Sequence, residues 1–566
     1  YTLYEKEMRE NNALDFDDII MKTVQLLQEN QDILEHYQHK FRYVLVDEYQ
    51  DTNHAQYVLT SLLAGGYQNI CVVGDDDQSI YKFRGATITN ILEFEKQFKN
   101  AYTIRLEQNY RSTGTILDAA NGLIRNNVNR KGKELWTDQA SGNKIKLHRS
   151  DTQESEAQYI AARILEGVAS GKKWSDFAVL YRNNVLSNAV ESAFRRNSIP
   201  YRIYKGRDFF SRAEIRDMFA YLWVIENPSD TLRLKRIINV PARKIGARSI
   251  EIAEQLAAEN DITLYEVVCH ADAYIELSRG ATPMKRFGEM IESLWEDRNT
   301  MSLSQLYDHM LDITGYQAAL ENKNDMESRS RLENIMELKS NIVEYESKAA
   351  QPSLAGFLEE MALYTDADGE DAEDDAVLMM TMHSAKGLEF PTVFLCGMED
   401  GLFPSFRAEE NEEDLEEERR LCYVAITRAK QQLYLTCAER RLMYGQTRYA
   451  HPSRFLQEIP QDLLDSNLTE RARNSEPAPA QPRKNYRPRS TVNPSYRAAS
   501  ALQTAASFGP APSFACGDRV MHKAFGEGMV TSVKPMGGDQ LLEIAFTAKG
   551  TKRLMAKSAS QFMHKI

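Results

Sequence analysis

Two adjacent carboxylates follow a short apolar run near the start of the chain. The segment at residues 43–52 reads YVLVDEYQDT, so Asp47 and Glu48 stand where the predicted strand ends. Ligands of α/β sheets bind at the carboxyl ends of the strands. Asp47 is suited to hold Mg²⁺, directly or through water, and Glu48 to orient and deprotonate an attacking water. Taken alone, the pair is equally compatible with an acidic turn that has no catalytic role.

A second predicted strand leads into a polar loop, and residues 71–86 read CVVGDDDQSIYKFRGA. Gln78 is able to contact a γ-phosphate and its attacking water without adding charge. Tyr81, Phe83 and Arg84 combine two aromatic rings with a cation, which suits base stacking and phosphate contact at about 1–3 kcal/mol per stacked base. Aromatic pairs also pack in cores, so this segment by itself is a modest signal.

Three further segments have the same character and follow in order along the chain. Residues 106–113 read LEQNYRST, residues 381–390 read TMHSAKGLEF, and residues 418–430 read ERRLCYVAITRAK. The last segment contains Arg428, and arginine suits the neutralisation of charge on a transferring phosphoryl group. Five such segments in this order and spacing, each at the end of a predicted strand, are not a coincidence.

The elements that would position these residues are short apolar runs alternating with amphipathic helices, a pattern typical of parallel α/β sheets. The predicted strands are 43–46, 70–73, 102–106, 145–148, 177–181, 377–382, 392–396 and 432–436. Residues 208–364 are predicted to be almost wholly helical and to interrupt the second sheet. Residues 471–512 contain seven prolines and predict a flexible linker. After them, residues 517–566 predict a small β-barrel.

Composition and charge exclude few functions. The chain has 566 residues, 42% of them hydrophobic and 27% charged, which is ordinary for globular proteins and favours three or four domains. Neither a signal peptide nor a long apolar run is apparent, and the six scattered cysteines predict neither a disulfide framework nor a zinc site. The net charge of −13 does not argue against nucleic acid, because it divides into −23 over residues 1–470 and +10 over residues 471–566.

Together the five segments resemble those of the UvrD/Rep/PcrA group of superfamily 1 helicases. The resemblance runs from LDFDD at residues 14–18 to PSRFL at residues 452–456, and includes the C-terminal barrel. It implies an α/β fold with two RecA-like parallel-sheet motor domains, the first incomplete. It also implies a large all-helical insertion in the second domain and a small C-terminal Tudor-like β-barrel. The implied activity is ATP- and Mg²⁺-dependent 3′→5′ unwinding of duplex DNA in repair and replication.

The resemblance also implies roles for individual residues. Asp47 and Glu48 resemble the Walker B pair, with Mg²⁺ at Asp47, and Gln78 resembles the γ-phosphate sensor. Tyr110 resembles the adenine-stacking aromatic and Glu389 the carboxylate near the ribose. Arg111 and Arg428 resemble the two arginine fingers. The residues that resemble DNA contacts are Tyr81, Phe83, Arg84, Asn184 and His383 for the single strand, and Arg243, Ile245 and Gly246 for the duplex.

The resemblance also implies the domain limits. They are 1–13 for the end of a helical insertion of the first motor domain, 14–107 for the C-terminal part of that domain, 108–207 and 376–465 for the two parts of the second motor domain, 208–375 for the helical arm, 466–512 for a disordered basic linker and 513–566 for the Tudor-like module.

Three features depart from the family pattern. Family members often have tryptophan where Phe83 stands, and glycine where Lys244 precedes Ile245 and Gly246. No GxxxxGK(S/T) loop occurs in the 566 residues. We therefore expect this chain to be a truncated piece with negligible DNA-stimulated ATPase by itself. Turnover above about 1 s⁻¹ would contradict that expectation.

Two other readings stay open. As it stands, the chain could be a non-hydrolysing module that binds DNA and RNA polymerase; a helicase–nuclease of the AddA type is a more remote alternative. The expected partners are single-stranded DNA and duplex junctions, together with RNA polymerase through the barrel. A protein of this kind is expected in the cytoplasm at the nucleoid, with no membrane association.

Overall fold

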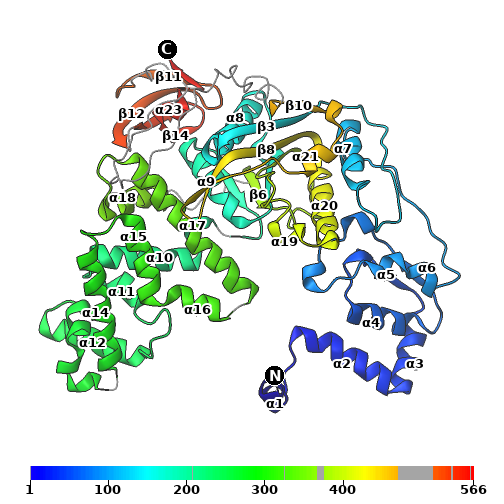
Figure 1. The fold of residues 1–566 in the computed structure, drawn as a ribbon, viewed down its shortest axis with the longest axis horizontal. Helices are drawn as coiled ribbons and strands as arrows, with labels where there is room; N and C mark the ends of the chain where they lie inside the picture. The colour runs from blue at the N-terminus through cyan, green and yellow to red at the C-terminus, as the bar shows by residue number, and fades with distance from the viewer. Residues whose placement is uncertain are drawn as a thin grey trace, which may run out of the picture.

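The computed structural model describes residues 2–206, 208–278, 280–323, 325–365, 375–468, 514–536, 539–560 and 562–566. The described residues form four bodies: an N-terminal lobe, a large central sheet with its helices, a helical arm inserted between two strands of that sheet, and a small barrel (Figure 1). From residue 469 onward, the linker predicted at 466–512 lies outside the described residues. In the part of the chain that is described, no helix has the length and apolar character needed to cross a membrane.

The N-terminal lobe is built on a two-stranded parallel sheet. Strands β1 (Val44–Val46) and β2 (Ile70–Val72) pair with Val44 opposite Ile70, as the apolar runs predicted. The helices of this lobe are α1 (Thr2–Glu10), α2 (Phe16–Glu29), α3 (Gln31–Lys40), α4 (His54–Ala64), α5 (Thr89–Leu92) and α6 (Phe94–Gln97).

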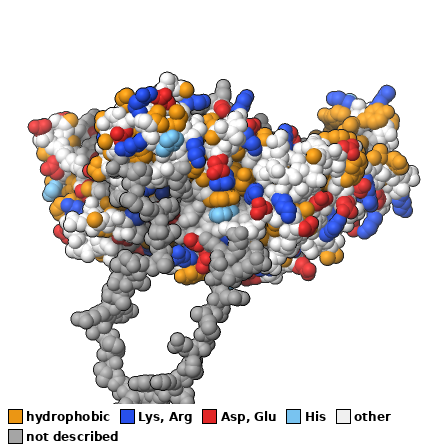
Figure 2. Space-filling model, turned by 90° about the horizontal axis from the view of Figure 1, so that it is seen from above, with side chains coloured by type: hydrophobic (Ala, Val, Ile, Leu, Met, Phe, Trp, Pro, Cys, Tyr) orange, Lys and Arg blue, Asp and Glu red, His pale blue; other side chains and the backbone are white. Residues whose placement is uncertain are grey.

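The strand predicted at 102–106 does not form. Residues 102–106 have no regular structure, and the side chains of Tyr102 and Leu106 are exposed. A strand needs a neighbour for its backbone hydrogen bonds, and among the described residues none runs alongside this segment. Figure 2 shows hydrophobic side chains gathered at the end of the molecule that carries this lobe.

The second lobe contains the larger sheet, in the order β10-β3-β8-β7-β4-β6-β5 with β9 paired to β8. The strands are β3 (Ile145–Thr152), β4 (Phe177–Tyr181), β5 (Tyr201–Ile203), β6 (Val377–Thr381), β7 (Phe390–Leu395), β8 (Ala429–Met443), β9 (Gln446–Tyr449) and β10 (Leu464–Ser466). The pairs are parallel except β8–β9. Central strand β4 is buried at every residue, as expected for a parallel sheet covered on both faces.

Helices pack on both faces of this sheet, and another set forms the arm. The second-lobe helices are α7 (Gly114–Ile124), α8 (Gln153–Ala169), α9 (Ser187–Arg196), α19 (Phe406–Glu409), α20 (Glu412–Ile426) and α21 (Phe455–Glu458). The arm contains α10 (Ala213–Glu226), α11 (Thr231–Ile237), α12 (Ala247–Asn260), α13 (Leu264–Cys269), α14 (Ala281–Asp297), α15 (Leu303–Thr314), α16 (Tyr316–Lys323), α17 (Met326–Lys348) and α18 (Leu354–Thr365). Because the arm leaves the sheet after β5 and returns at its neighbour β6, it is an insertion, with its own core around Tyr221, Phe287 and Phe357.

The C-terminal barrel is an antiparallel sheet in the order β14-β13-β12-β11-β15. Its strands are β11 (Arg519–His522), β12 (Gly526–Met536), β13 (Asp539–Phe546), β14 (Gly550–Met555) and β15 (Met563–Lys565), with the short helix α23 (Ala556–Ala559). Val520, Leu542, Ile544 and Leu554 are buried in its interior. The predicted α/β class, helical insertion and small terminal barrel are thus confirmed.

Candidate nucleotide and DNA site between the lobes

The carboxylate pair lies at the carboxyl end of β1. The backbone N–H of Glu48 donates to Asp47 Oδ1 at 2.9 Å, and Gln50 Nε2 donates to Glu48 Oε2 at 2.6 Å. Glu48 adopts φ of 50°, a left-handed conformation that side-chain-bearing residues seldom take. Both carboxylates remain exposed to an approaching ligand. This turn holds the two side chains at the edge of the N-terminal lobe that meets the second lobe.

Lys386 connects this pair to the second lobe. Its ammonium lies 2.5 Å from Asp51 Oδ2 and 3.4 Å from Glu48 Oε2, and it donates to the carbonyl of Gln78 at 2.8 Å. The Lys386 side chain is only 7% exposed. Burial raises the pKa of Asp51, against the lowering effect of Lys386. Sequence reasoning missed Lys386 as a site residue, although it stands in the TMHSAKGLEF segment.

Gln78 occupies a loop that is fixed from both lobes. Its amide donates to Asp75 Oδ2 at 2.8 Å. From the second lobe, Arg130 donates to both oxygens of Asp77 at 3.0 and 2.7 Å, and Arg420 donates to the carbonyl of Ser79 at 3.0 Å. Burial raises the pKa of Asp77, and the Arg130 hydrogen bond opposes that shift. The loop is therefore an interlobe contact as well as a candidate phosphate sensor.

Three aspartates in this loop, at 75–77, lie close enough together to hold a metal ion. Their oxygens are already engaged: Lys133 pairs with Asp75, Arg130 with Asp77, and the backbone of residue 131 donates to Asp76. Asp47 fits Mg²⁺ better, because its carboxylate is an exposed hard oxygen donor at the strand end beside Glu48.

Arg111 and Glu389 form an ion pair on the second lobe. Arg111 Nε lies 2.5 Å from Glu389 Oε2, and Lys430 Nζ lies 2.6 Å from the other carboxylate oxygen. Lys430 first and Arg111 next lower the pKa of Glu389 to about 2. The neighbouring Tyr110 ring is exposed, and its hydroxyl donates to Gln108 Oε1 at 2.8 Å. An exposed aromatic next to a charged triad suits a base and a sugar hydroxyl.

Arg428 is only 2% exposed. Its guanidinium donates to the carbonyls of Val424 and Leu388 at 2.9 and 3.2 Å, and to Thr427 Oγ1 at 3.0 Å. Burial first, and then repulsion from Arg111, lowers the pKa of Arg428 to about 10. The structure therefore brings Arg428 near Arg111 but gives it no direct bond to Asp47 or Glu48.

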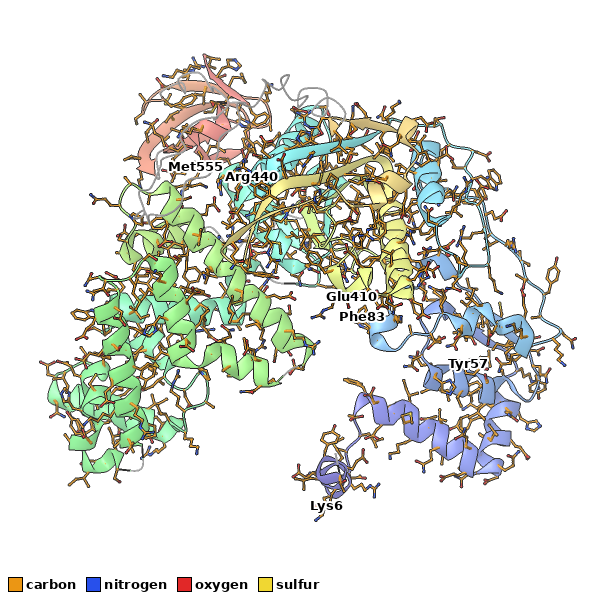
Figure 3. The ribbon with its side chains drawn as sticks, viewed as in Figure 1. Lys6, Tyr57, Phe83, Glu410, Arg440 and Met555 are labelled. Atoms are coloured by element: carbon orange, nitrogen blue, oxygen red, sulfur yellow. The ribbon has the colours of Figure 1, made fainter. Side chains whose placement is uncertain are left out.

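Four of the predicted DNA-contacting residues form one cluster. The ring of Phe83 lies 5.8 Å from that of Tyr81 and 5.4 Å from that of His383, and the Arg84 guanidinium lies 5.5 Å from both the Tyr81 and the Phe83 rings. Phe83 is 47% exposed and lies near α19 and α20, where the lobes meet (Figure 3). Asn184, the remaining residue predicted to contact the single strand, is exposed on the second lobe between β4 and α9.

The arm residues predicted to touch duplex DNA have different surroundings. Arg243 points inward and donates to Tyr221 Oη at 2.7 Å and to the carbonyl of Thr314 at 3.2 Å. Ile245 is buried in the arm core, whereas Gly246 is exposed. Lys244 adopts φ of 62°, so the tight turn forms although a lysine stands where the family has glycine.

Acid should destabilise the fold through His383. Burial, with Arg182 and Arg84 nearby, lowers its pKa to about 3 from the ordinary 6.5. Below pH 6.5 the unfolded chain therefore binds a proton that the folded chain does not, and stability is lost as the pH falls toward 3. We expect His383→Gln to flatten the unfolding free energy between about pH 6 and pH 5, by up to about 1.4 kcal/mol per pH unit.

The measurement is denaturant unfolding at several pH values. The exposed His36, replaced by glutamine in the same way, is the matched control. Parallel curves for His383→Gln and the parent chain would show that the folded protein protonates this ring as readily as the unfolded chain does.

Models of known protein families match three parts of the chain. The family model for the UvrD/REP helicase N-terminal domain matches residues 1–99, and that for the UvrD-like helicase C-terminal domain matches residues 104–440. The model for the PcrA/UvrD tudor domain matches residues 516–560. The chain belongs to the UvrD-like family of DNA helicases, and the resemblance found in its motifs is confirmed.

Its relatives include named enzymes. The chain is 45% identical to the ATP-dependent DNA helicase PcrA of Staphylococcus epidermidis over 564 residues, which cover 99% of this chain and 75% of the relative. It is 44% identical to the ATP-dependent DNA helicase PcrA of Staphylococcus aureus, over 99% of this chain and 76% of that relative.

Proposed function

We propose that this chain belongs to an ATP-dependent 3′→5′ DNA helicase that unwinds duplex DNA in repair and replication. The observation that carries the proposal is the interlobe contact at Lys386. Through it, the carboxylates after β1, the Gln78 loop and the second lobe meet at one place. A ligand bound there would touch both lobes, which is what coupling of ATP hydrolysis to lobe movement requires.

Each residue near the nucleotide then has a defined role. Asp47 would hold Mg²⁺, and Glu48 would orient and deprotonate the attacking water. Gln78 would sense the γ-phosphate, Tyr110 would stack on adenine and Glu389 would accept a hydrogen bond from the ribose. ATP supplies the transferable phosphoryl group. Arg111 and Arg428 would neutralise the charge that develops on it.

The DNA contacts belong to the same proposal. Tyr81, Phe83, Arg84, Asn184 and His383 would line the path of the single strand. On the arm, Gly246 presents exposed backbone to the duplex, while Arg243 and Ile245 shape the loop from inside. The domain limits given above, from 1–13 to 513–566, are kept as the proposed division. The proposed location is the cytoplasm, at the nucleoid, where chromosomal DNA lies.

The direct test uses this sequence joined to a phosphate-binding segment from a family member. We expect DNA-stimulated ATP hydrolysis and unwinding of a duplex with a 3′ single-stranded tail, but not of one with a 5′ tail. Equal unwinding of the two substrates would overturn the proposed polarity.

Phe83→Ala is expected to uncouple this joined protein. ATP should still turn over, but unwinding should fail, because the Phe83 ring would stack on bases at about 1–3 kcal/mol and does not touch the nucleotide residues. Phe41→Ala is the matched control, because Phe41 is a similarly exposed phenylalanine of the same lobe, at 40% against 47%. Slowed hydrolysis with intact unwinding would contradict the assignment.

A second candidate function is that of a binding module without hydrolysis. It is favoured by one observation: the 566 residues contain no GxxxxGK(S/T) loop to cradle the β- and γ-phosphates. An ATPase assay of the joined protein described above separates the two candidates, because only the helicase should hydrolyse ATP once a phosphate-binding segment is present.

We also propose that the barrel docks on RNA polymerase and is not the main DNA-binding element. Its aromatic residues Phe525, Phe546 and Phe562 are buried, so they cannot offer a stacking surface to bases. The full chain should retain RNA polymerase in a pull-down. Loss of DNA binding without loss of polymerase retention, on deleting residues 513–566, would assign the barrel to DNA instead.

A further inference from the structure

The barrel touches the second lobe through the outer edge of one strand. In the described residues β14 pairs with β13 on one side, and β14 ends the strand order. An end strand presents unpaired backbone groups, which attract other polypeptides. Here the carbonyl of Arg553 accepts a hydrogen bond of 2.6 Å from Ser198 Oγ, in the turn between α9 and β5. The second lobe therefore occupies part of an edge that would otherwise be open.

An aromatic contact supports this edge contact. Trp174, just before β4, and Phe525 of the barrel have ring centroids 6.4 Å apart and planes inclined by 33°. Both side chains are buried, and apolar residues of the barrel and of the second lobe belong to one continuous cluster. The barrel thus contacts the second lobe at a defined surface beside α8 and α9, on the far side of the molecule from the N-terminal lobe (Figure 1).

We propose that the barrel docks reversibly on the second lobe through the outer edge of β14, and that a protein partner pairing with this edge must first displace it. The partner would bind in an extended conformation, by adding a strand to β14 through backbone hydrogen bonds. The identity of that partner as RNA polymerase rests on the proposed function, whereas the docking itself does not.

The contacts are of the kind expected for a reversible interface. A neutral hydrogen bond and an aromatic pair each stabilise an interface only modestly. Such contacts are sufficient to dock a domain of the same chain, because the covalent connection raises the effective concentration of the barrel near the second lobe. Figure 3 shows Met555, the last residue of β14, at the barrel and far from Phe83, so docking would hide the barrel from partners without covering Phe83.

Cross-linking of the full chain tests the docking. In a background with the exposed Cys71 and Cys516 replaced by serine, Ser198→Cys and Arg553→Cys should be joined rapidly by a short bismaleimide, independently of protein concentration. The control pairs Ser198→Cys with Met529→Cys, because Met529 is exposed on β12, two strands away from β14. Equal cross-linking of the two pairs would overturn the docking.

The cross-linked chain then tests the competition. Purified RNA polymerase should bind the cross-linked double variant, Ser198→Cys with Arg553→Cys, at least tenfold more weakly than the same protein before cross-linking. Equal binding would overturn the competition while leaving the docking in place. If RNA polymerase binds neither form, the proposed partner is wrong, and the cross-linking result still decides whether the barrel docks.

Discussion

Replacing Arg428 by alanine should slow ATP hydrolysis by about 10³–10⁵-fold and change the affinity for ATP far less. The guanidinium now bonds to the carbonyls of Val424 and Leu388 and lies near Arg111, whose charge repels it. An anion between the two arginines would relieve this repulsion. The relief grows as negative charge develops on the departing phosphoryl group, so the loss should appear in kcat.

The measurement is single-turnover and steady-state hydrolysis by the joined protein that carries a phosphate-binding segment. Because Arg428 also bonds to the backbone, Arg428→Lys serves as control: it keeps the charge but loses the planar fork, and should recover part of the rate. Unfolding midpoints of both variants separate a fold defect from a catalytic one. If kcat of Arg428→Ala stayed within about threefold of the parent, under about 1 kcal/mol, the arginine-finger role would be withdrawn.

The parallel strands and the chemistry-bearing loops could be predicted from the sequence because both are local patterns. β4 is an unbroken apolar run, and Asp47, Gln78 and Arg111 all follow predicted strands or loops in segments that can be read directly. The prediction failed at 102–106, where an alternating apolar pattern meets no neighbouring strand in the described residues. An alternating apolar pattern shows that a segment tends to form a strand, but only a neighbouring strand supplies the hydrogen bonds that the strand needs.

The contacts between lobes could not be predicted in this way. Lys386 and Asp51 are 335 positions apart, and Arg420 and Ser79 are 341 apart. Nothing in the local sequence of Lys386 indicates that its ammonium enters the loop of the other lobe. Arg243 shows the opposite case, since a basic residue predicted to contact duplex DNA points into the arm core. Packing, which the local sequence does not reveal, determines where these side chains point.

A buried ion network in the second lobe illustrates the same limit and carries the last prediction. Arg441, on β8, bonds to Glu399 at 2.9 and 2.5 Å and to Glu156 at 2.6 Å. All three side chains are at most 4% exposed. The carboxylates also accept from backbone and hydroxyl donors, including the N–H of Gly397 to Glu156 and that of Ala438 to Glu399. The network joins three elements: helix α8, strand β8 and the segment that follows β7.

Arg441→Leu should destabilise the second lobe by about 3–5 kcal/mol, because removing one member of a buried ion network leaves an uncompensated buried charge. Arg440→Leu is the matched control: Arg440 is the adjacent, exposed residue on β8 (Figure 3), and its loss should cost under about 1 kcal/mol. Denaturant unfolding of the full chain measures both.

The pH dependence of the stability lost in Arg441→Leu distinguishes an unpaired buried carboxylate from the loss of side-chain packing. Without Arg441, burial would raise the pKa of Glu156 or Glu399 in the folded state above its unfolded value. The folded variant would then bind a proton that the unfolded chain releases, so its stability should fall as the pH rises and recover as the pH drops. The deficit of Arg441→Leu relative to the parent should therefore be smaller near pH 5 than near pH 8. A deficit of the same size at both values would mean that the arginine contributes through packing of its side chain and not through its charge.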